Sequence, residues 1–110
     1  MGSMEQSFKR LEELKNLQED WDSYGGQKIS SKSIEVAEQI ISETNIEPEF
    51  IAPISYGGVQ LEYRMFYSEL EIEIYSDGRL CYFLNSLAEN SDEAANKINN
   101  FLTKIESYNK

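Results

Sequence analysis

Residues 59–84 read VQLEYRMFYSELEIEIYSDGRLCYFL, and this stretch decides the fold. Apolar and polar side chains alternate over residues 59–66 and again over residues 69–75, which is typical of strands that bury one face and expose the other. Asp77-Gly78 is a strong signal for a tight hairpin turn, and residues 80–84 follow it as a third strand. The stretch therefore predicts an antiparallel, three-stranded meander with one face in water.

The segments that flank the meander have the spacing of amphipathic helices. Apolar residues recur at helical intervals over about residues 4–20 and 31–43, and from about Ser91 to the end of the chain. Ser30 is a good N-cap for the second segment. Residues 50–54 form a short extended edge segment, interrupted by Pro53, which makes a fourth strand if it pairs. We therefore predict a two-layer α+β domain, order α-α-β-β-β-α, with the meander packed against helices.

The composition excludes several classes of site. The chain has 110 residues, the size of one domain, which we expect to span residues 4–110, and residues 1–3 read as a tag remnant. With no His and one Cys, there is no Ser-His or Cys-His pair, no imidazole ligand and no internal disulfide. We predict no catalytic residue, no metal and no cofactor. No apolar run is long enough to span a membrane. Because a single Cys cannot form an internal disulfide, we expect a protein of the reducing cytoplasm.

The negative charge is concentrated in the middle of the chain. Between Glu35 and Glu93 there are 13 acidic residues, against the two bases Arg64 and Arg79, so this segment has a net charge of −11. The whole chain has a net charge of −10, so the two ends together are almost neutral. Such an acidic surface repels phosphate and argues against direct binding of nucleic acid.

The alternation assigns side chains to the exposed face of the meander. A turn at Tyr67-Ser68 would place Arg64 opposite Glu71 and Glu62 opposite Glu73. A two-residue turn at Asp77-Gly78 would bring Leu80 and Tyr82 to this face and send Cys81 and Phe83 to the core, and a one-residue bulge would reverse that assignment. Under the first register, the exposed face carries a set of acidic, basic and aromatic side chains: Glu62, Arg64, Glu71, Glu73, Tyr75 and Tyr82.

Carboxylates beside tyrosines suit a basic partner, since aromatic residues and complementary charge are useful at interfaces. Our leading hypothesis is a small, non-enzymatic protein-binding module of the inhibitor, antitoxin or anti-defence kind. In this hypothesis its acidic face docks on a nuclease, a toxin or another nucleic-acid-binding protein.

Three other interpretations stay open. The acidic face can be an ordinary solvated surface that keeps the protein soluble. Glu62, Glu71 and Glu73 can also form a metal-binding or hydrolytic site, because clustered carboxylates bind divalent cations. The chain can instead be a structural subunit that associates through its last helix, so both a monomer and a weak homodimer are compatible with the sequence.

A loop at residues 21–26, WDSYGG, follows the first predicted helix. Its paired glycines indicate a tight turn, and we expect Trp21 and Tyr24 to hold the loop against the core. Cys81 is interpreted as a small strand residue rather than a nucleophile, because no His or Lys stands nearby in the sequence to activate it.

The chain also carries a resemblance in WDSYG at 21–25, GVQLEY at 58–63 and LEIEI at 70–74 followed by Asp77-Gly78. Together these segments resemble a group of small bacterial and phage proteins with a Trp-Asp-x-Tyr-Gly loop, a Leu-Glu-Trp/Tyr strand and an acidic alternating strand. The resemblance covers about residues 11–85 and departs at Ser23, where the group often has Gly, and at Gly26, where it often has Ala. It implies a bacterial or phage origin and no particular activity.

Overall fold

The computed structural model describes residues 2–86 and 92–109, and their side chains from Met4 onward. The elements follow one another as α1 (Gly2–Lys15), α2 (Ser31–Thr44), β1 (Phe50–Pro53), β2 (Val59–Met65), β3 (Ser68–Ile74), β4 (Leu80–Ser86), α3 (Asp92–Glu106) and the short 3-10 helix η1 (Ser107–Asn109). The predicted α+β class and the meander packed against helices are confirmed. The edge segment does pair, so the sheet has four antiparallel strands in the order β1-β2-β3-β4.

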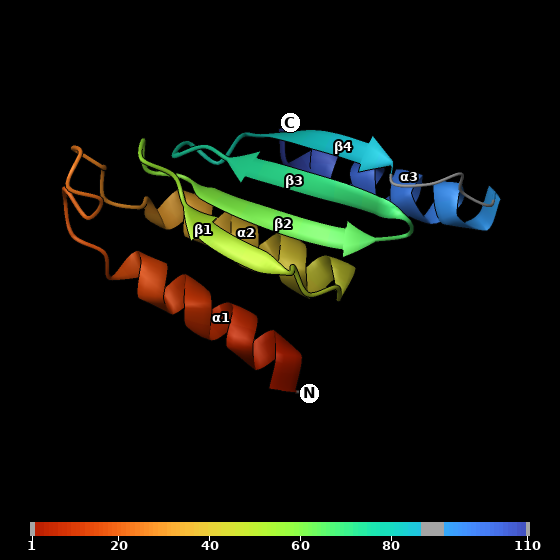
Figure 1. The fold of residues 1–110 in the computed structure, drawn as a ribbon, viewed down its shortest axis with the longest axis horizontal. Helices are drawn as coiled ribbons and strands as arrows, with labels where there is room; N and C mark the ends of the chain where they lie inside the picture. Colours follow the sequence, from red (N-terminus) through yellow and green to blue (C-terminus); the bar gives the residue numbers. More distant parts are fainter. Residues whose placement is uncertain (1, 87–91, 110) are drawn as a thin grey trace.

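The helices cover one face of the sheet and leave the other open. In Figure 1, α2 and α3 lie behind the sheet, and α1 runs along the side of β1. The core is formed by the alternate residues of β2 and β3 that the pattern predicts, packed against apolar residues of all three α-helices. The fully buried side chains include Val59, Leu61, Ile72 and Ile74 from the sheet and Leu11, Ile40, Ile41 and Ile105 from the helices.

Helix α1 ends earlier than predicted. Its last residue is Lys15 rather than Asp20, and the next two residues turn by bonds from the Asn16 and Leu17 amides to the carbonyls of Glu13 and Leu14. Asp20 has a positive φ of 63°, which no helix interior accepts. The chain therefore leaves the helix early and enters the loop that contains Trp21.

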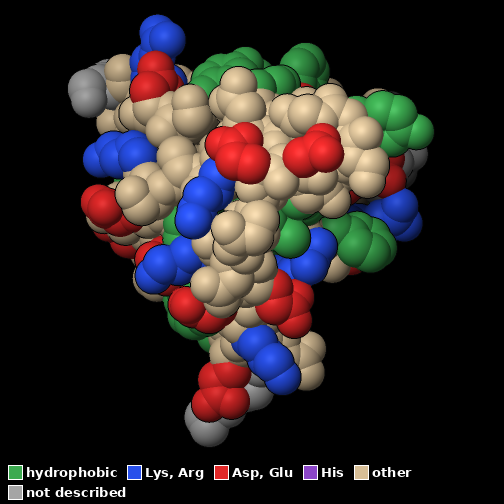
Figure 2. All heavy atoms as spheres, turned by 90° about the vertical axis from the view of Figure 1, so that its left-hand side faces the viewer, with side chains coloured by type: hydrophobic (Ala, Val, Ile, Leu, Met, Phe, Trp, Pro, Cys, Tyr) green, Lys and Arg blue, Asp and Glu red, His purple; other side chains and the backbone are tan. Residues whose placement is uncertain are grey.

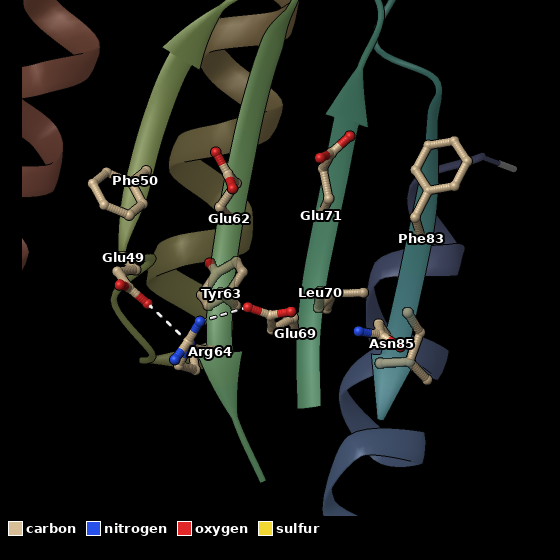
Figure 3. A pocket seen from close by; sticks show the side chains of 11 residues that line it. Glu49, Phe50, Glu62, Tyr63, Arg64, Glu69, Leu70, Glu71, Phe83 and Asn85 are labelled. Carbon is tan, nitrogen blue, oxygen red and sulfur yellow. Dashed lines mark hydrogen bonds and ion pairs between the residues drawn. The ribbon is translucent and has the colours of Figure 1, made fainter. Parts of the chain in front are cut away.

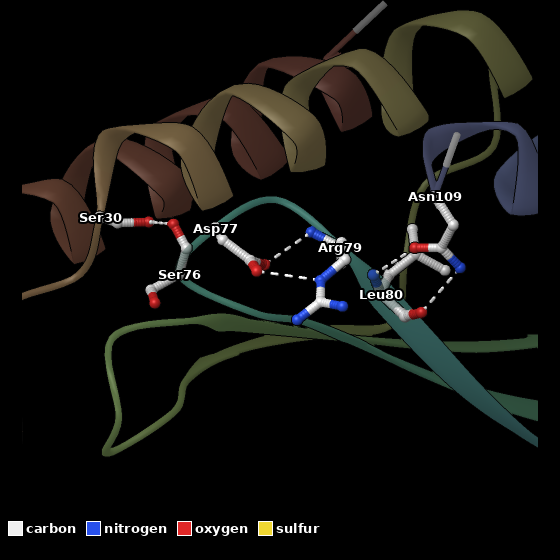
Figure 4. Close-up of polar contacts among 6 residues, drawn as sticks. All are labelled: Ser30, Ser76, Asp77, Arg79, Leu80 and Asn109. Atoms are coloured by element: carbon white, nitrogen blue, oxygen red, sulfur yellow. Dashed lines mark hydrogen bonds and ion pairs between the residues drawn. The ribbon is translucent and has the colours of Figure 1, made fainter.

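Helix α2 begins as its sequence predicts. The Ser30 hydroxyl accepts a hydrogen bond from the Ser33 amide at 3.0 Å, which is the N-cap arrangement. The same hydroxyl donates to the Ser76 carbonyl at 2.8 Å and ties the start of α2 to the β3–β4 turn (Figure 4). Helix α3 buries Ile98, Phe101 and Ile105 in the expected stripe. Its expected N-cap, Ser91, lies outside the described residues.

The β2–β3 hairpin turns one residue earlier than predicted, which shifts the pairing of β2 by two residues along β3. Phe66 and Tyr67, not Tyr67 and Ser68, form the turn, and both have positive φ values, of 52° and 58°. Two central residues with positive φ make the turn type whose twist matches that of paired strands. Ser68 is buried and pairs with Met65. As a result Glu62 lies opposite Glu71, and Arg64 lies opposite Glu69.

The β3–β4 hairpin has the bulged arrangement. Its amide bonds run from Tyr75 to the Arg79 carbonyl and from Gly78 to the Tyr75 carbonyl, and Gly78 has a φ of 93°. This is a three-residue loop that closes with a left-handed glycine. The extra residue pairs Leu80 with Ile74. The predicted placement is therefore wrong for this strand: Leu80 and Tyr82 face the helices, and Cys81 and Phe83 face the open side.

Candidate protein-interaction surface

A row of four side chains crosses the open face of the sheet. Phe50 of β1 pairs with Glu62 of β2, Glu62 pairs with Glu71 of β3, and Glu71 pairs with Phe83 of β4. Figure 3 shows these side chains on the same side of the sheet, one from each strand. We call this set, Phe50, Glu62, Glu71 and Phe83, the central row. It brings two carboxylates together between two phenyl rings.

The central row lines a shallow depression of about 310 Å³. Phe50 is 60% exposed and Phe83 is 59% exposed, so both rings present apolar surface to solvent. Arg64, Glu69 and Asn85 line the same depression on the side toward the β2–β3 turn. The hollow therefore combines exposed aromatic surface with carboxylate oxygens.

The two central glutamates have no cation beside them. Arg64, the nearest base on β2, instead forms ion pairs with Glu69 at 2.5 Å and with Glu49 at 3.9 Å. The ion pairs among the described residues include neither Glu62 nor Glu71. Partial burial raises the pKa of Glu71, and the neighbouring Glu73 and Glu62 raise it further. Directly opposed like charges destabilise a sheet, so this pair has a cost that a bound cation would remove.

A tyrosine cluster adjoins the central row at the end nearer the β3–β4 turn. The Tyr56 hydroxyl donates to Glu73 at 3.2 Å, and its ring lies 6.1 Å from the ring of Tyr75. The Tyr75 hydroxyl is 3.1 Å from the Cys81 sulfur, and this contact is the main cause that raises the pKa of Tyr75 to about 12. Both hydroxyls are therefore neutral near pH 7.

The structure gathers five of the six predicted surface residues. Glu62, Arg64, Glu71 and Glu73 lie on the open face, and Tyr75 borders it. Tyr82 does not belong there, because the bulged hairpin turns it toward α3, where its hydroxyl donates to Glu106 at 2.7 Å. Sequence reasoning missed Phe50, Phe83 and Tyr56. The bulged alternative already implied an open-face Phe83, but Phe50 required knowledge of the β1–β2 register.

The loop at residues 21–26 presents Tyr24 to solvent rather than to the core. Tyr24 is 92% exposed, so the expectation that it holds the loop in place is wrong. Trp21 does pack against the core, and its indole donates to the Gln27 carbonyl at 2.8 Å. Asp22 accepts bonds from the amides of Tyr24 and Gly26, and these bonds lower its pKa. The backbone, rather than Tyr24, therefore holds the loop.

The end of the molecule that carries the loop at residues 21–26 and the β3–β4 turn has mixed charge. Figure 2 shows Lys and Arg side chains interspersed with Asp and Glu over this end. Asp77 and Arg79 form one such pair at 2.9 Å in the β3–β4 turn. This end therefore differs from the central row, where the two carboxylates stand without a base.

Within residues 2–86 and 92–109, no group of three or more His, Cys, Asp and Glu side chains is arranged to hold a metal ion. None of the helices in that part of the chain is long and apolar enough to cross a membrane. No family model, curated protein or solved structure matches the chain. The open face of the sheet is thus the feature of this structure that bears on function.

Proposed function

We propose that this chain is a non-enzymatic protein-binding module whose open sheet face docks on a basic surface of a partner protein. The observation that carries the proposal is the central row, in which Glu62 and Glu71 oppose each other between the exposed rings of Phe50 and Phe83. A Lys or Arg side chain of a partner would neutralise the opposed carboxylates. Its binding would therefore be favoured both by the new ion pairs and by the repulsion it removes.

The flanking phenyl rings favour an arginine over a small cation. A guanidinium can donate hydrogen bonds to both carboxylates from its planar fork while it lies against an aromatic face. Contacts of this kind contribute most when they are desolvated, and a partner that covers the depression of about 310 Å³ would exclude water from it. Phe50 and Phe83 would also bury apolar surface on binding, in the way that interface aromatics do.

The chemistry of the surface supports one class of partner. A protein that binds nucleic acid has a groove lined by Lys and Arg, and a carboxylate-rich sheet with exposed aromatics can occupy that groove. We therefore propose an inhibitor or antitoxin role, in which the open face blocks the nucleic-acid site of a nuclease, a toxin or a related protein. The net charge of −10 would speed the encounter at low salt.

A charge-reversal experiment tests the proposal. Immobilised wild-type protein would be compared with Glu62→Lys/Glu71→Lys on lysate of the source cells, and captured proteins would then be purified for direct binding measurements. A matched control is Glu12→Lys/Glu38→Lys, which makes the same charge change on exposed positions of α1 and α2. We expect a basic protein to bind the wild type and the control and to lose at least tenfold in affinity for the central-row variant, which corresponds to about 1.4 kcal/mol.

The result that would refute the proposal is equal binding by both double variants. Binding that persists unchanged as salt rises would refute it as well, since charge-driven association weakens with ionic strength. Circular dichroism and thermal unfolding of all three proteins would establish that a loss of binding does not reflect a loss of fold.

A further inference from the structure

We infer that the outer edge of β4 is a docking site for an extended segment of a partner, which adds as a fifth strand and carries basic residues at alternate positions. The inference rests on the proposed function for the charge of the partner and adds its mode of binding. The evidence for the edge itself comes from the backbone of β4 and from the composition of that strand, and the acids of the open face determine only the charge of the segment that fits it.

The hydrogen-bonding pattern identifies which groups of β4 point outward. The Tyr75 amide bonds to the Arg79 carbonyl across the hairpin, so the groups of residue 79 and of alternate residues after it point toward β3. Leu80 points the other way, because the Asn109 side chain accepts from its amide at 2.7 Å and donates to its carbonyl at 2.9 Å (Figure 4). By the same alternation, the amides and carbonyls of Tyr82 and Leu84 point away from the sheet.

These outward groups lack partners in the described part of the chain. No hydrogen bond to the backbone of Tyr82 or Leu84 crosses the outer side of β4 within residues 2–86 and 92–109. The Asn109 carboxamide imitates a neighbouring strand at Leu80, but it covers that one residue. The free part of the edge therefore begins directly after it.

The opposite edge of the sheet is protected, whereas among residues 2–86 and 92–109 the edge of β4 is covered by Asn109 at Leu80 and is left open beyond it. Strand β1 has four residues, ends in Pro53 and has its Ile51 carbonyl bonded to Arg10 of α1 at 3.0 Å. Strand β4 has seven residues, and its sequence, LCYFLNS, contains no charge, no proline and no glycine. Proteins usually protect an edge strand with charges, proline, a bulge or a covering element. A long, uncharged edge without such protection is suited to strand addition.

The side chains around this edge determine what kind of strand fits. On the open face, an added strand would lie beside Phe83 and Asn85, with Glu69 and Glu71 one strand further on, within reach of long basic side chains. On the helix-covered face it would lie beside Leu84, which is 41% exposed, and an apolar residue would cover it. Basic and apolar residues should therefore alternate in the segment.

A second copy of this chain fits the edge less well. Pairing β4 with another β4 would bring up a strand with no basic residue, so the glutamates of β3 would remain unneutralised. It would also bring together two chains that each have a net charge of −10. A segment with alternating basic and apolar residues would bond to the outward backbone groups of β4, cover the Leu84 side chain and neutralise the glutamates of β3.

The probe is a short synthetic peptide in which Lys and Val alternate, and its control has the same composition with the Lys and Val residues in separate blocks. Amide exchange measured by NMR should slow at Tyr82 and Leu84 when the alternating peptide binds. Leu84→Pro removes an outward amide that makes no bond within the sheet, so the fold should tolerate it. We expect it to weaken binding about fivefold beyond Leu84→Ala, which removes the side chain and keeps the amide.

The edge proposal would be overturned by equal binding of the two peptides, by no binding of the alternating peptide, or by a Leu84→Pro variant that binds as well as Leu84→Ala. It would also be overturned if Tyr82 and Leu84 became protected with rising protein concentration alone, because the occupant would then be a second copy.

The double variant Glu62→Gln/Glu71→Gln distinguishes the edge proposal from the proposed function of the open face. Peptide binding that needs these glutamates but leaves Tyr82 and Leu84 unprotected would refute the edge and retain the proposed function. Edge protection that is indifferent to both glutamates would support strand addition, but it would refute the role of the acidic face and with it the basic character of the segment.

Discussion

Glu71 is the residue at which structural cost and proposed function coincide. It has carboxylate neighbours along its own strand at Glu73 and across the sheet at Glu62, and no base pairs with it among the described residues. If position 71 had only a structural role, Gln would suit it better, because Gln has a similar shape without the repulsion. The unfavourable pair is what a surface selected for a cationic partner should contain.

Replacing Glu71 with Gln should therefore stabilise the free protein at neutral pH. Because the folded-state pKa of Glu71 is raised, the folded state holds this proton more tightly than the unfolded state does. This contribution to stability is lost as pH rises from the ordinary carboxyl range through the raised pKa. At pH 7 we expect Glu71→Gln to increase the free energy of unfolding by about 0.5 kcal/mol, the scale of a cross-strand pair.

Urea unfolding of wild type and Glu71→Gln at several pH values would measure this difference. The gain should shrink as pH falls through the titration of Glu71. Glu38→Gln, on the exposed side of α2, is a control that should change stability little at any pH. A Glu71→Gln variant less stable than wild type at pH 7 would contradict the account.

At the scale of elements, the turns determined how the strands pair, which the alternation within each strand could not predict. The period-two alternation placed Glu62, Arg64, Glu71 and Glu73 on one face, because neighbouring residues of a strand always point to opposite faces. It could not pair the strands, since that depends on the backbone angles of the turns, and a left-handed Phe66-Tyr67 pair has no strong sequence signal. The single bulge residue before β4 then exchanged Tyr82 for Phe83 on the open face. Fold class was thus predictable, and the composition of the central row was only partly so.

Ser30 joins two elements through one hydroxyl, and its substitution can separate the two bonds. The hydroxyl accepts from the Ser33 amide and donates to the Ser76 carbonyl. Ser30→Ala loses both interactions and should lower the free energy of unfolding by about 1 to 2 kcal/mol. Ser30→Asp keeps a good N-cap acceptor but has no proton to donate at neutral pH, so it should recover only part of that loss.

Chemical denaturation of the three proteins would give these values, and amide exchange at Gly78 would report on the β3–β4 turn. The turn should open more readily in both variants, whereas α2 should be weakened in Ser30→Ala alone. Equal stability of Ser30→Asp and wild type would mean that the bond to Ser76 contributes nothing. No effect of Ser30→Ala would contradict the N-cap itself.

At the scale of the whole molecule, the net negative charge destabilises the folded state. A net charge of −10 on 110 residues produces self-repulsion in the compact state, and the ion pairs that offset it have exposed side chains on both partners. Exposed pairs contribute little each and are themselves screened by salt. The repulsion among the acids of the middle segment should therefore dominate the response to ionic strength.

Adding salt should consequently stabilise the free protein. Between about 0.01 M and 0.15 M ionic strength the screening length falls from about 30 Å to about 8 Å, which removes repulsion between separate parts of the surface but leaves close pairs largely intact. We expect thermal unfolding to move to higher temperature over this range, by less in Glu62→Gln/Glu71→Gln, which has already lost two of the repelling charges. A fall in unfolding temperature with added salt would show that the surface ion pairs outweigh the repulsion.

The same salt should weaken binding to a basic partner, so that one solution variable would stabilise the isolated fold while it dissociates the complex. A protein whose acidic face served solubility alone would show the first response without the second.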